Sequence, residues 1–301
     1  MKLLLAVLVL TFSVGSLRAQ DSEMNEIRER YLSWLDGRDV DYDDPYTMIR
    51  YNFIVNAYDW ASDYSSFDLD SPGAEWDLTT NTDKNEFRNV CARLIELCTI
   101  YNIEGPVGDP NPHFEDPETL ELILQVFDFI EGNGLDGDTY FGSYFTPGFE
   151  LYGLGSTAIL RSASYSNSIL LMRDELLATG RLNAHLEALD NITFFWSPEN
   201  PHFDFVNTGT NADGIKVLSQ GRLIYALCQE DGTPDRIEDM EHYIAFLDNA
   251  LKIAPGWADT FKPDLMTYHH RGIYSNNYGA TALMSVSAVE WILSGSAYAL
   301  S

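Results

Sequence analysis

The chain has 301 residues, of which 45% are hydrophobic and 13% aromatic, so it can bury a substantial core in one or two domains and is not a disordered tail. Its 46 acidic and 18 basic residues give a formal net charge of −28. This charge argues against nucleic acid or an anionic membrane as a partner.

Residues 1–20 are predicted to be a secretory signal peptide, with one domain spanning residues 21–301. Lys2 supplies the positive start, residues 3–12 form an apolar run, and residues 17–19 approximate a cleavage site. The run is shorter than the roughly 20 residues that a membrane span needs, and no later segment is apolar enough to be one. We therefore expect a protein that is secreted, or periplasmic if the source is bacterial.

Nearly all of the remaining chain has the periodicity of amphipathic helices, with apolar residues three and four positions apart. The predicted helices span residues 23–35, 46–64, 84–101, 117–131, 165–179, 182–195, 213–228, 236–253 and 278–293. Asp116-Pro117 and Pro234-Asp235 mark two helix starts. With no convincing strand series, the pattern predicts an all-α fold in which antiparallel helix pairs build an α/α toroid or solenoid.

Two long loops, residues 134–155 and 196–211, are rich in aromatic residues, among them Trp196. Such loops can present surfaces on which sugars stack, although packing within the loop is the more common role of a single ring. Cys91 and Cys98 are seven residues apart on a predicted helix, about 10 Å along its axis and beyond disulfide reach. We expect the cysteines to be buried thiols.

Two segments contain the residues suited to acid–base chemistry. Residues 207–213 read Asn-Thr-Gly-Thr-Asn-Ala-Asp, and residues 261–279 read Phe-Lys-Pro-Asp-Leu-Met-Thr-Tyr-His-His-Arg-Gly-Ile-Tyr-Ser-Asn-Asn-Tyr-Gly. Adjacent histidines, nearby tyrosines and an upstream asparagine are the groups needed to remove a weakly acidic proton. The combination favours a lyase.

From about Asp116 to Ala282 the chain resembles the helical catalytic domain of polysaccharide lyase family 8, the chondroitin and hyaluronate lyases, and most closely the chondroitin ABC lyase branch. The resemblance rests on residues 170–182, on residues 207–213 with Gln220-Gly-Arg-Leu223, and on residues 261–264 with His270-Arg-Gly-Ile-Tyr274. It implies an incomplete α/α toroid and β-elimination on a uronate-containing glycosaminoglycan. The implied partner is this anionic polysaccharide.

The resemblance also implies roles for individual residues. Asn211 would neutralise the uronate carboxylate, as oxyanion-hole donors do; its alternative role is to cap the next helix. Tyr278 would act as both acid and base, with Tyr274 as the alternative. A tyrosine has an ordinary pKa of about 10, so it can accept a proton only where neighbouring groups favour its phenolate. His270 fits the His-x-Gly-x-Tyr pattern, whereas His269 is nine residues before Tyr278.

His269, Arg271, Tyr274 and Trp196 are the expected substrate contacts. No cofactor is expected, because adjacent histidines point in different directions and no metal-ligand spacing supports them. The net charge disfavours a polyanion, but Lys216, Arg222, Lys262 and Arg271 supply positive charge within the motif segments, and high salt would screen the repulsion.

Two departures from the family pattern concern the C-terminal side of the tyrosine segment. The family supplies an arginine, a glutamate and β-sandwich domains there, whereas this sequence ends at Ser301. We therefore expect binding with slow or absent cleavage. The alternatives are a carbohydrate-binding protein without activity and an α/α-toroid glycoside hydrolase using Asp204 and Asp213 as its carboxylate pair.

Overall fold

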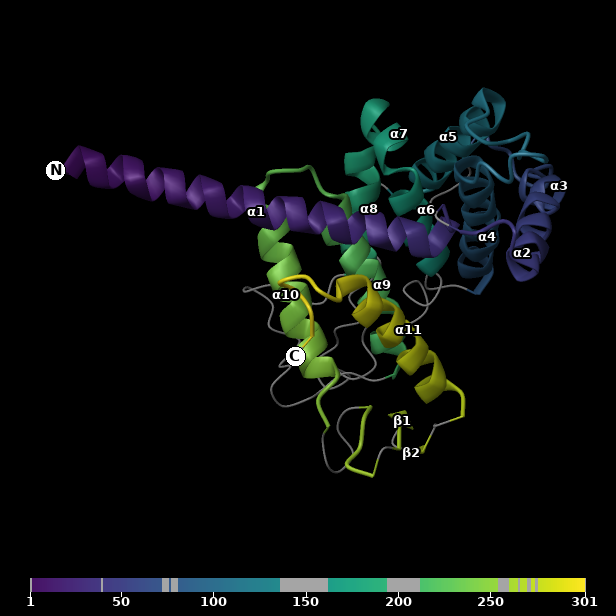
Figure 1. Cartoon of the computed structure of the whole chain (residues 1–301). Coiled ribbons are helices and arrows are strands. Elements are labelled where there is room, and N and C mark those ends of the chain that lie inside the picture. The colour runs from purple at the N-terminus through teal and green to yellow at the C-terminus, as the bar shows by residue number, and fades with distance from the viewer. Residues whose placement is uncertain are drawn as a thin grey trace. The chain divides into compact units, whose positions relative to one another are not determined.

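The computed structural model describes residues 2–38, 40–71, 76, 81–135, 162–193, 212–253, 260–264, 266–269, 272–273 and 276–300 (Figure 1). The chain forms two compact units: unit 1 contains residues 1–31 and 204–301, and unit 2 contains residues 32–203. Helix α1 (Lys2–Asp36) contributes to both. Within the described part of the chain, no helix combines the length and apolar character needed to cross a membrane.

Unit 2 is organised around the long helix α4. Its helices are α2 (Pro45–Val55), α3 (Tyr58–Ala61), α4 (Asn81–Asn102), α5 (Pro117–Gly132), α6 (Ala163–Leu171), α7 (Arg173–Ala178) and α8 (Leu182–Thr193). Helix α4 packs against α2, α3, α5 and α6. It can do so because Phe87, Val90, Leu94 and Leu97, spaced three and four residues apart, are all buried.

The helix boundaries follow the caps that the sequence predicts. Asp116 caps α5, its carboxylate accepting a hydrogen bond of 2.8 Å from the backbone N of Thr119, and Pro117 occupies the first turn. All three cysteines, Cys91, Cys98 and Cys228, lie buried in described helices, as predicted. Burial raises the pKa of the Cys91 thiol, which keeps it protonated and unreactive.

Two of the predicted helices are interrupted. The helix expected at residues 46–64 is split into α2 and α3, because Ala57 N bonds to Ile54 O at 3.0 Å, a tighter turn than the α-helix. The helix expected at residues 165–179 is split into α6 and α7 at Met172, whose φ of −107° and ψ of 16° lie outside the helical region. Both splits occur in segments whose apolar periodicity is continuous.

The core of unit 2 contains a buried tyrosine–histidine pair. The hydroxyl of Tyr165 on α6 lies 2.8 Å from Nδ1 of His185 on α8, and the ring of Phe127 lies 4.7 Å from the imidazole. Nε2 of His185 has no hydrogen-bond partner among the described residues. Burial lowers the pKa of His185 from 6.5 to about 4; Asp128 opposes this shift and Arg181 adds to it. His185 is therefore neutral at pH 7.

This pair predicts that the chain loses stability in mild acid. The unfolded chain, whose histidine keeps its ordinary pKa, takes up a proton before the folded chain does, so stability falls as the pH drops below about 6.5. Between about pH 7 and pH 5 the loss assigned to His185 is about 2 kcal/mol. His185→Gln should remove it, measured by urea unfolding at both pH values. The matched variant His242→Gln, at a side chain 30% exposed on another helix, should keep the wild-type difference; equal pH dependence in wild type and His185→Gln would contradict the assignment.

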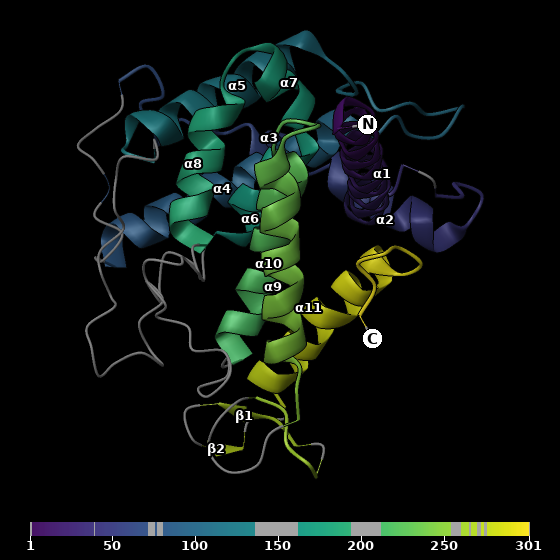
Figure 2. The ribbon, with the colours of Figure 1, turned by 90° about the vertical axis from the view of Figure 1, so that its left-hand side faces the viewer.

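Unit 1 contains α9 (Ala212–Cys228), α10 (Pro234–Ala250), α11 (Tyr278–Leu293) and two short strands, β1 (Tyr268–His269) and β2 (Gly272–Ile273). Residues 229–233 connect α9 to α10, and a link this short makes the two helices antiparallel neighbours. Helix α10 therefore runs back along α9 (Figure 2). Helix α11 packs on the other helix of this pair, α9. The interface is apolar, with Leu218, Leu223, Val286 and Val289 buried.

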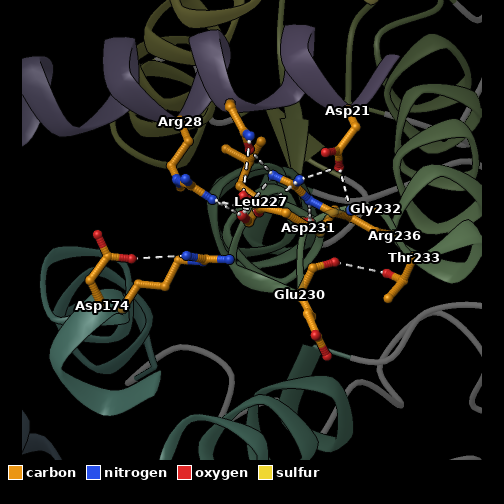
Figure 3. Close-up of polar contacts among 12 residues, drawn as sticks. Asp21, Arg28, Asp174, Leu227, Glu230, Asp231, Gly232, Thr233 and Arg236 are labelled. Atoms are coloured by element: carbon orange, nitrogen blue, oxygen red, sulfur yellow. Dashed lines mark hydrogen bonds and ion pairs between the residues drawn. The ribbon is translucent and has the colours of Figure 1, made fainter. Parts of the chain in front are cut away.

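A fully buried arginine ties the N-terminal part of unit 1 to the turn between α9 and α10 (Figure 3). All five N–H groups of Arg236 have acceptors: Asp21 Oδ1 at 2.6 Å, Asn25 Oδ1 at 2.8 Å, Asp231 Oδ1 at 3.0 Å, Leu227 O at 3.2 Å and Ala226 O at 3.3 Å. Arg28 also bonds Asp231 at 3.2 Å. We call these residues the Arg236 network. It makes residues 21–28 an integral part of unit 1.

Candidate lyase site

The described part of the motif segment before α11 contains a turn and a pair of short strands. Phe261 pairs with Thr267 in an isolated antiparallel bridge, and the backbone N of Lys262 donates to Met266 O at 3.1 Å. Asp264 Oδ1 accepts from the backbone N of Met266 at 3.1 Å, which closes the turn that Pro263 begins. The short-range bonds fix the path of the chain toward the two histidines.

The strands β1 and β2 pair with each other. The strands are antiparallel, with Tyr268 opposite Ile273 and His269 opposite Gly272. His270 and Arg271 are therefore the two residues that connect the strands in the sequence. The sequence analysis did not predict these strands. The pattern that could have indicated a hairpin is a glycine two residues beyond the histidine pair, in a segment that contains the strand-favouring residues tyrosine and isoleucine.

Tyr278 is the first residue of α11, as predicted, and its side chain is half-buried. Asn277 precedes the helix, and its carbonyl accepts hydrogen bonds from the backbone N and from Oγ1 of Thr281, both at 2.9 Å. The first turn of a helix carries N–H groups without helical partners and the positive end of the macrodipole. Tyr278 thus lies where an anionic group is favoured.

The helices that follow the two motif segments both begin at one end of unit 1. Because α9 and α11 both run opposite to α10, the first residues of α9 and α11 lie at the same end of the unit, next to the β1–β2 pair (Figures 1 and 2). Asn211 directly precedes Ala212, the first residue of α9, and β1 packs against α11. Asn211 is thus at the position from which a side chain can cap α9, so this alternative role stays open.

Most of the predicted site residues lie outside the described residues. This holds for Asn211, His270, Arg271, Tyr274 and Trp196, and for Asp204 of the hydrolase alternative. For His269 and Asp213 only the backbone is described, in β1 and α9 respectively. Tyr278 is the predicted site residue whose side-chain burial the structure gives, and the convergence of Asn211, His270 and Tyr278 stays a prediction.

Two of the predicted sources of positive charge are not available to a substrate. Arg222 is 6% exposed, forms a 3.2 Å ion pair with Asp239 on α10, and lies 4.2 Å above the ring of Tyr225. Asp239 is held from its other side by Gln229 at 2.7 Å. Lys262 is 4% exposed. The charge of Arg222 is therefore paired within unit 1, and the side chain of Lys262 is buried. Lys216 is half-buried.

In the described part of the chain, no group of three or more histidine, cysteine, aspartate or glutamate side chains is placed to hold a metal ion.

Comparison with known proteins places the chain among lyases. Residues 129–301 match the family described as "Lyase, catalytic". Over 166 residues the chain is 26% identical to the chondroitin sulfate ABC exolyase of Bacteroides thetaiotaomicron. The aligned region covers 55% of this chain and 14% of that protein. The chain therefore spans a small part of this relative.

Two solved structures resemble it more completely. They are chondroitin AC lyase of Streptomyces coelicolor A3 as a mutant, and the same lyase in complex with chondroitin sulphate, each with a TM-score of 0.64 and 16% identity over 92% of this chain. The chain covers 33% and 34% of these structures. At this identity the likeness concerns the fold, and it confirms the predicted all-α, α/α-toroid class. The family match extends over more than half of the chain and includes both motif segments, so the chain belongs to the "Lyase, catalytic" family of polysaccharide lyases.

Proposed function

We propose that the chain belongs to polysaccharide lyase family 8 and acts on a uronate-containing glycosaminoglycan of the chondroitin or hyaluronan type. The observation that carries the proposal is the family match over residues 129–301, which contains the asparagine segment and the histidine–tyrosine segment. The relatives are a chondroitin sulfate ABC exolyase and a chondroitin AC lyase, one structure of which contains chondroitin sulphate. The starts of α9 and α11, which follow these segments in the sequence, lie at one end of unit 1 and support the proposal further.

The reaction is a β-elimination. A base takes the C5 proton of the uronate, the C4–O bond breaks, a double bond forms between C4 and C5, and an acid gives a proton to the departing oxygen. The C5 proton is weakly acidic because the adjacent carboxylate resists a second negative charge. A donor on the carboxylate therefore lowers the barrier, as donors in an oxyanion hole do.

Three residues divide this work in the proposal. Asn211 donates to the carboxylate, His270 is the proton acceptor or favours ionisation of the tyrosine, and Tyr278 protonates the leaving oxygen. They must lie within hydrogen-bond reach of one sugar ring, about 2.6–3.2 Å from the atoms on which they act. His269 and Tyr274 are the alternatives for the histidine and tyrosine roles, and Arg271 and Trp196 would contact the polymer.

Product analysis tests the proposal. The chain is incubated with chondroitin sulfate and with hyaluronan, and the products are followed by absorbance at about 232 nm, where the conjugated acid formed by C5 proton removal absorbs. An increase in absorbance with each new chain end supports β-elimination. New reducing ends without absorbance would assign a hydrolase, and oligosaccharide binding without any new ends would assign a carbohydrate-binding protein.

The net charge of −28 predicts an unusual salt dependence for the approach of this substrate. A negative protein repels a polyanion, and the repulsion is screened as the Debye length falls from about 30 Å at 0.01 M to about 8 Å at 0.15 M salt. The association rate constant for a chondroitin sulfate oligosaccharide should therefore rise over this range. Stopped-flow measurements against an uncharged oligosaccharide of equal length provide the control; a rate that falls with salt would show that local positive charge dominates.

A further inference from the structure

A row of exposed apolar side chains runs along α2 and α3 in unit 2. Tyr46 is 82% exposed, Ile49 67%, Phe53 74% and Trp60 49%. We call these four residues the α2–α3 stripe. Both helices pack on α4 (Figure 1), and they bury Tyr51 and Ala61. A row of exposed apolar side chains on helices that already have buried residues is a candidate binding surface.

The three rings of the stripe recur at an interval of seven residues. Tyr46 and Phe53, both on α2, are therefore two helical turns apart, about 10.5 Å along the axis, and share one face of α2. The backbone between the helices stays right-handed but tightens, with φ of −67° and ψ of −12° at Asn56 and φ of −78° and ψ of −6° at Ala57. Trp60 follows on α3, beyond this tighter turn.

Polar groups accompany the rings on this face. Arg50, Asn52 and Asn56 are exposed between them. The guanidinium of Arg93, from α4, lies 4.7 Å from the centre of the Trp60 ring, and its Nη1 donates to the carbonyl oxygen of Trp60. The indole is held in place from α4 and still remains half-exposed. Flat apolar rings alternate with hydrogen-bond donors.

This alternation suits a sugar chain. The C–H faces of a pyranose are apolar and lie flat on an aromatic ring, while its hydroxyl rim needs hydrogen-bond partners, which amide and guanidinium groups supply. A step of about 10.5 Å is about the length of two sugar units in an extended polysaccharide. The rings of Tyr46 and Phe53 would then meet the same sugar of two successive disaccharide repeats.

A second copy of the chain fits the stripe less well. The four exposed side chains offer roughly 500 Å² of apolar surface, below the roughly 800 Å² that each partner contributes to a stable interface. The flanking side chains Arg50, Asn52 and Asn56 would also need partners across such an interface. A sugar chain satisfies both the rings and the donors.

We propose that the α2–α3 stripe is a second polysaccharide-binding surface, which holds an extended, disaccharide-repeat polymer by stacking. The nature of the polymer rests on the proposed function: it is the uronate polymer that unit 1 would cleave. The stripe belongs to unit 2, whereas Asn211, His270 and Tyr278 belong to unit 1. The step from Tyr46 to Phe53 alone spans about two sugar units, so binding across all three rings requires about four sugar units or more.

The test uses the full chain with Tyr278→Phe, so that the polymer stays intact. Binding of hyaluronan disaccharide, hexasaccharide and polymer is measured by calorimetry and by tryptophan fluorescence. The variant Phe53→Ser with Trp60→Ser should weaken binding of the hexasaccharide and polymer about tenfold or more and leave disaccharide binding unchanged. The matched control is Val107→Ser with Leu177→Ser, at side chains that are 105% and 46% exposed in the same unit. All four positions are exposed, so circular dichroism should show an unchanged fold.

The outcomes separate this inference from the proposed function. The stripe is supported if the hexasaccharide binds more tightly than the disaccharide, and if the stripe variant loses this difference while the control variant keeps it. This holds whether or not unit 1 forms an unsaturated product. Unchanged hexasaccharide binding in the stripe variant overturns it, even if elimination is observed. A wild-type dimer in sedimentation that the stripe variant dissociates also overturns it, because the stripe would then bind a second copy.

Discussion

Replacing Tyr278 by phenylalanine is expected to lower the rate of elimination at least about a hundredfold and to leave polysaccharide affinity nearly unchanged. The substitution deletes only the hydroxyl that moves the proton, and general acid–base groups of this kind contribute about 10²- to 10⁴-fold. The ring stays and can still pack at the half-buried start of α11. An interaction made only in the transition state is thereby lost.

The measurement compares initial rates of product absorbance and, separately, oligosaccharide affinity. Tyr274→Phe is the matched control, because it removes a hydroxyl from the other tyrosine of the same segment. It should affect the rate less than Tyr278→Phe does. Full activity in Tyr278→Phe together with a large loss in Tyr274→Phe would transfer the role to Tyr274, and full activity in both would exclude a tyrosine from the chemistry.

Replacing Arg236 by leucine is expected to destabilise the chain by about 3–5 kcal/mol. The guanidinium is fully buried and its five N–H groups bind Asp21, Asn25, Asp231 and two backbone carbonyls. Burial lowers the pKa of Arg236, and the carboxylates of Asp231 and Asp21 oppose that shift. Without this cation, Asp21 loses its ion pair with Arg236, while Asp231 retains Arg28 at 3.2 Å, so the two carboxylates are left with less compensating charge at partly buried positions.

Arg181→Ala is the matched control, because Arg181 forms a 2.6 Å ion pair with Asp128 at the surface, with the two side chains 29% and 48% exposed. An exposed pair of this kind contributes about 0–1 kcal/mol. Urea unfolding of both variants checks the contrast. Equal losses for Arg236→Leu and Arg181→Ala would show that the Arg236 network does not hold unit 1 together.

The Arg236 network also bears on the N-terminus. Asp21 and Asn25 come directly after the predicted signal peptide of residues 1–20. Cleavage that leaves Asp21 keeps every contact of Arg236, whereas a chain that starts at residue 29 would lose Asp21 and Asn25 together. Such a shortened chain should have the same defect as Arg236→Leu. The structure has α1 continuous from Lys2 to Asp36, so cleavage at residue 20 stays a prediction.

Local signals in the sequence predicted most helix positions. Helix α11 spans Tyr278–Leu293 as expected, and α5 begins at Pro117 because Asp116 caps it. These features depend on residues within one or two turns of each other. The breaks at Ala57 and Met172 were not predictable, because the apolar periodicity continues through both and neither is preceded by glycine or proline.

Contacts between distant segments had no counterpart in the sequence pattern. Arg236 bonds to Asp21 across 215 positions, and nothing in the composition of either segment singles out that pair. Arg222 shows the opposite case: its position in a motif segment suggested substrate contact, but its charge is satisfied by Asp239 inside unit 1. A motif gives the residue type and its order in the chain, whereas packing decides which side chains remain available.

The candidate site is known at the level of its segments. The sequence predicted that Asn211, His270 and Tyr278 act together, and the structure puts the starts of α9 and α11 and the β1–β2 pair at one end of unit 1. How the three side chains face each other is decided by residues 194–211 and 270–275, most of which lie outside the described chain.

A crystal structure of the Tyr278→Phe chain with a uronate tetrasaccharide tests the central proposal most directly. We expect one uronate ring with the Asn211 side chain on its carboxylate and His270 beside C5. The edge of the substituted ring at position 278 should lie beside the C4 oxygen, within about 4 Å of where a hydroxyl would donate. A tetrasaccharide bound elsewhere, or Asn211 and the ring at position 278 on opposite faces of unit 1, would contradict the proposed site.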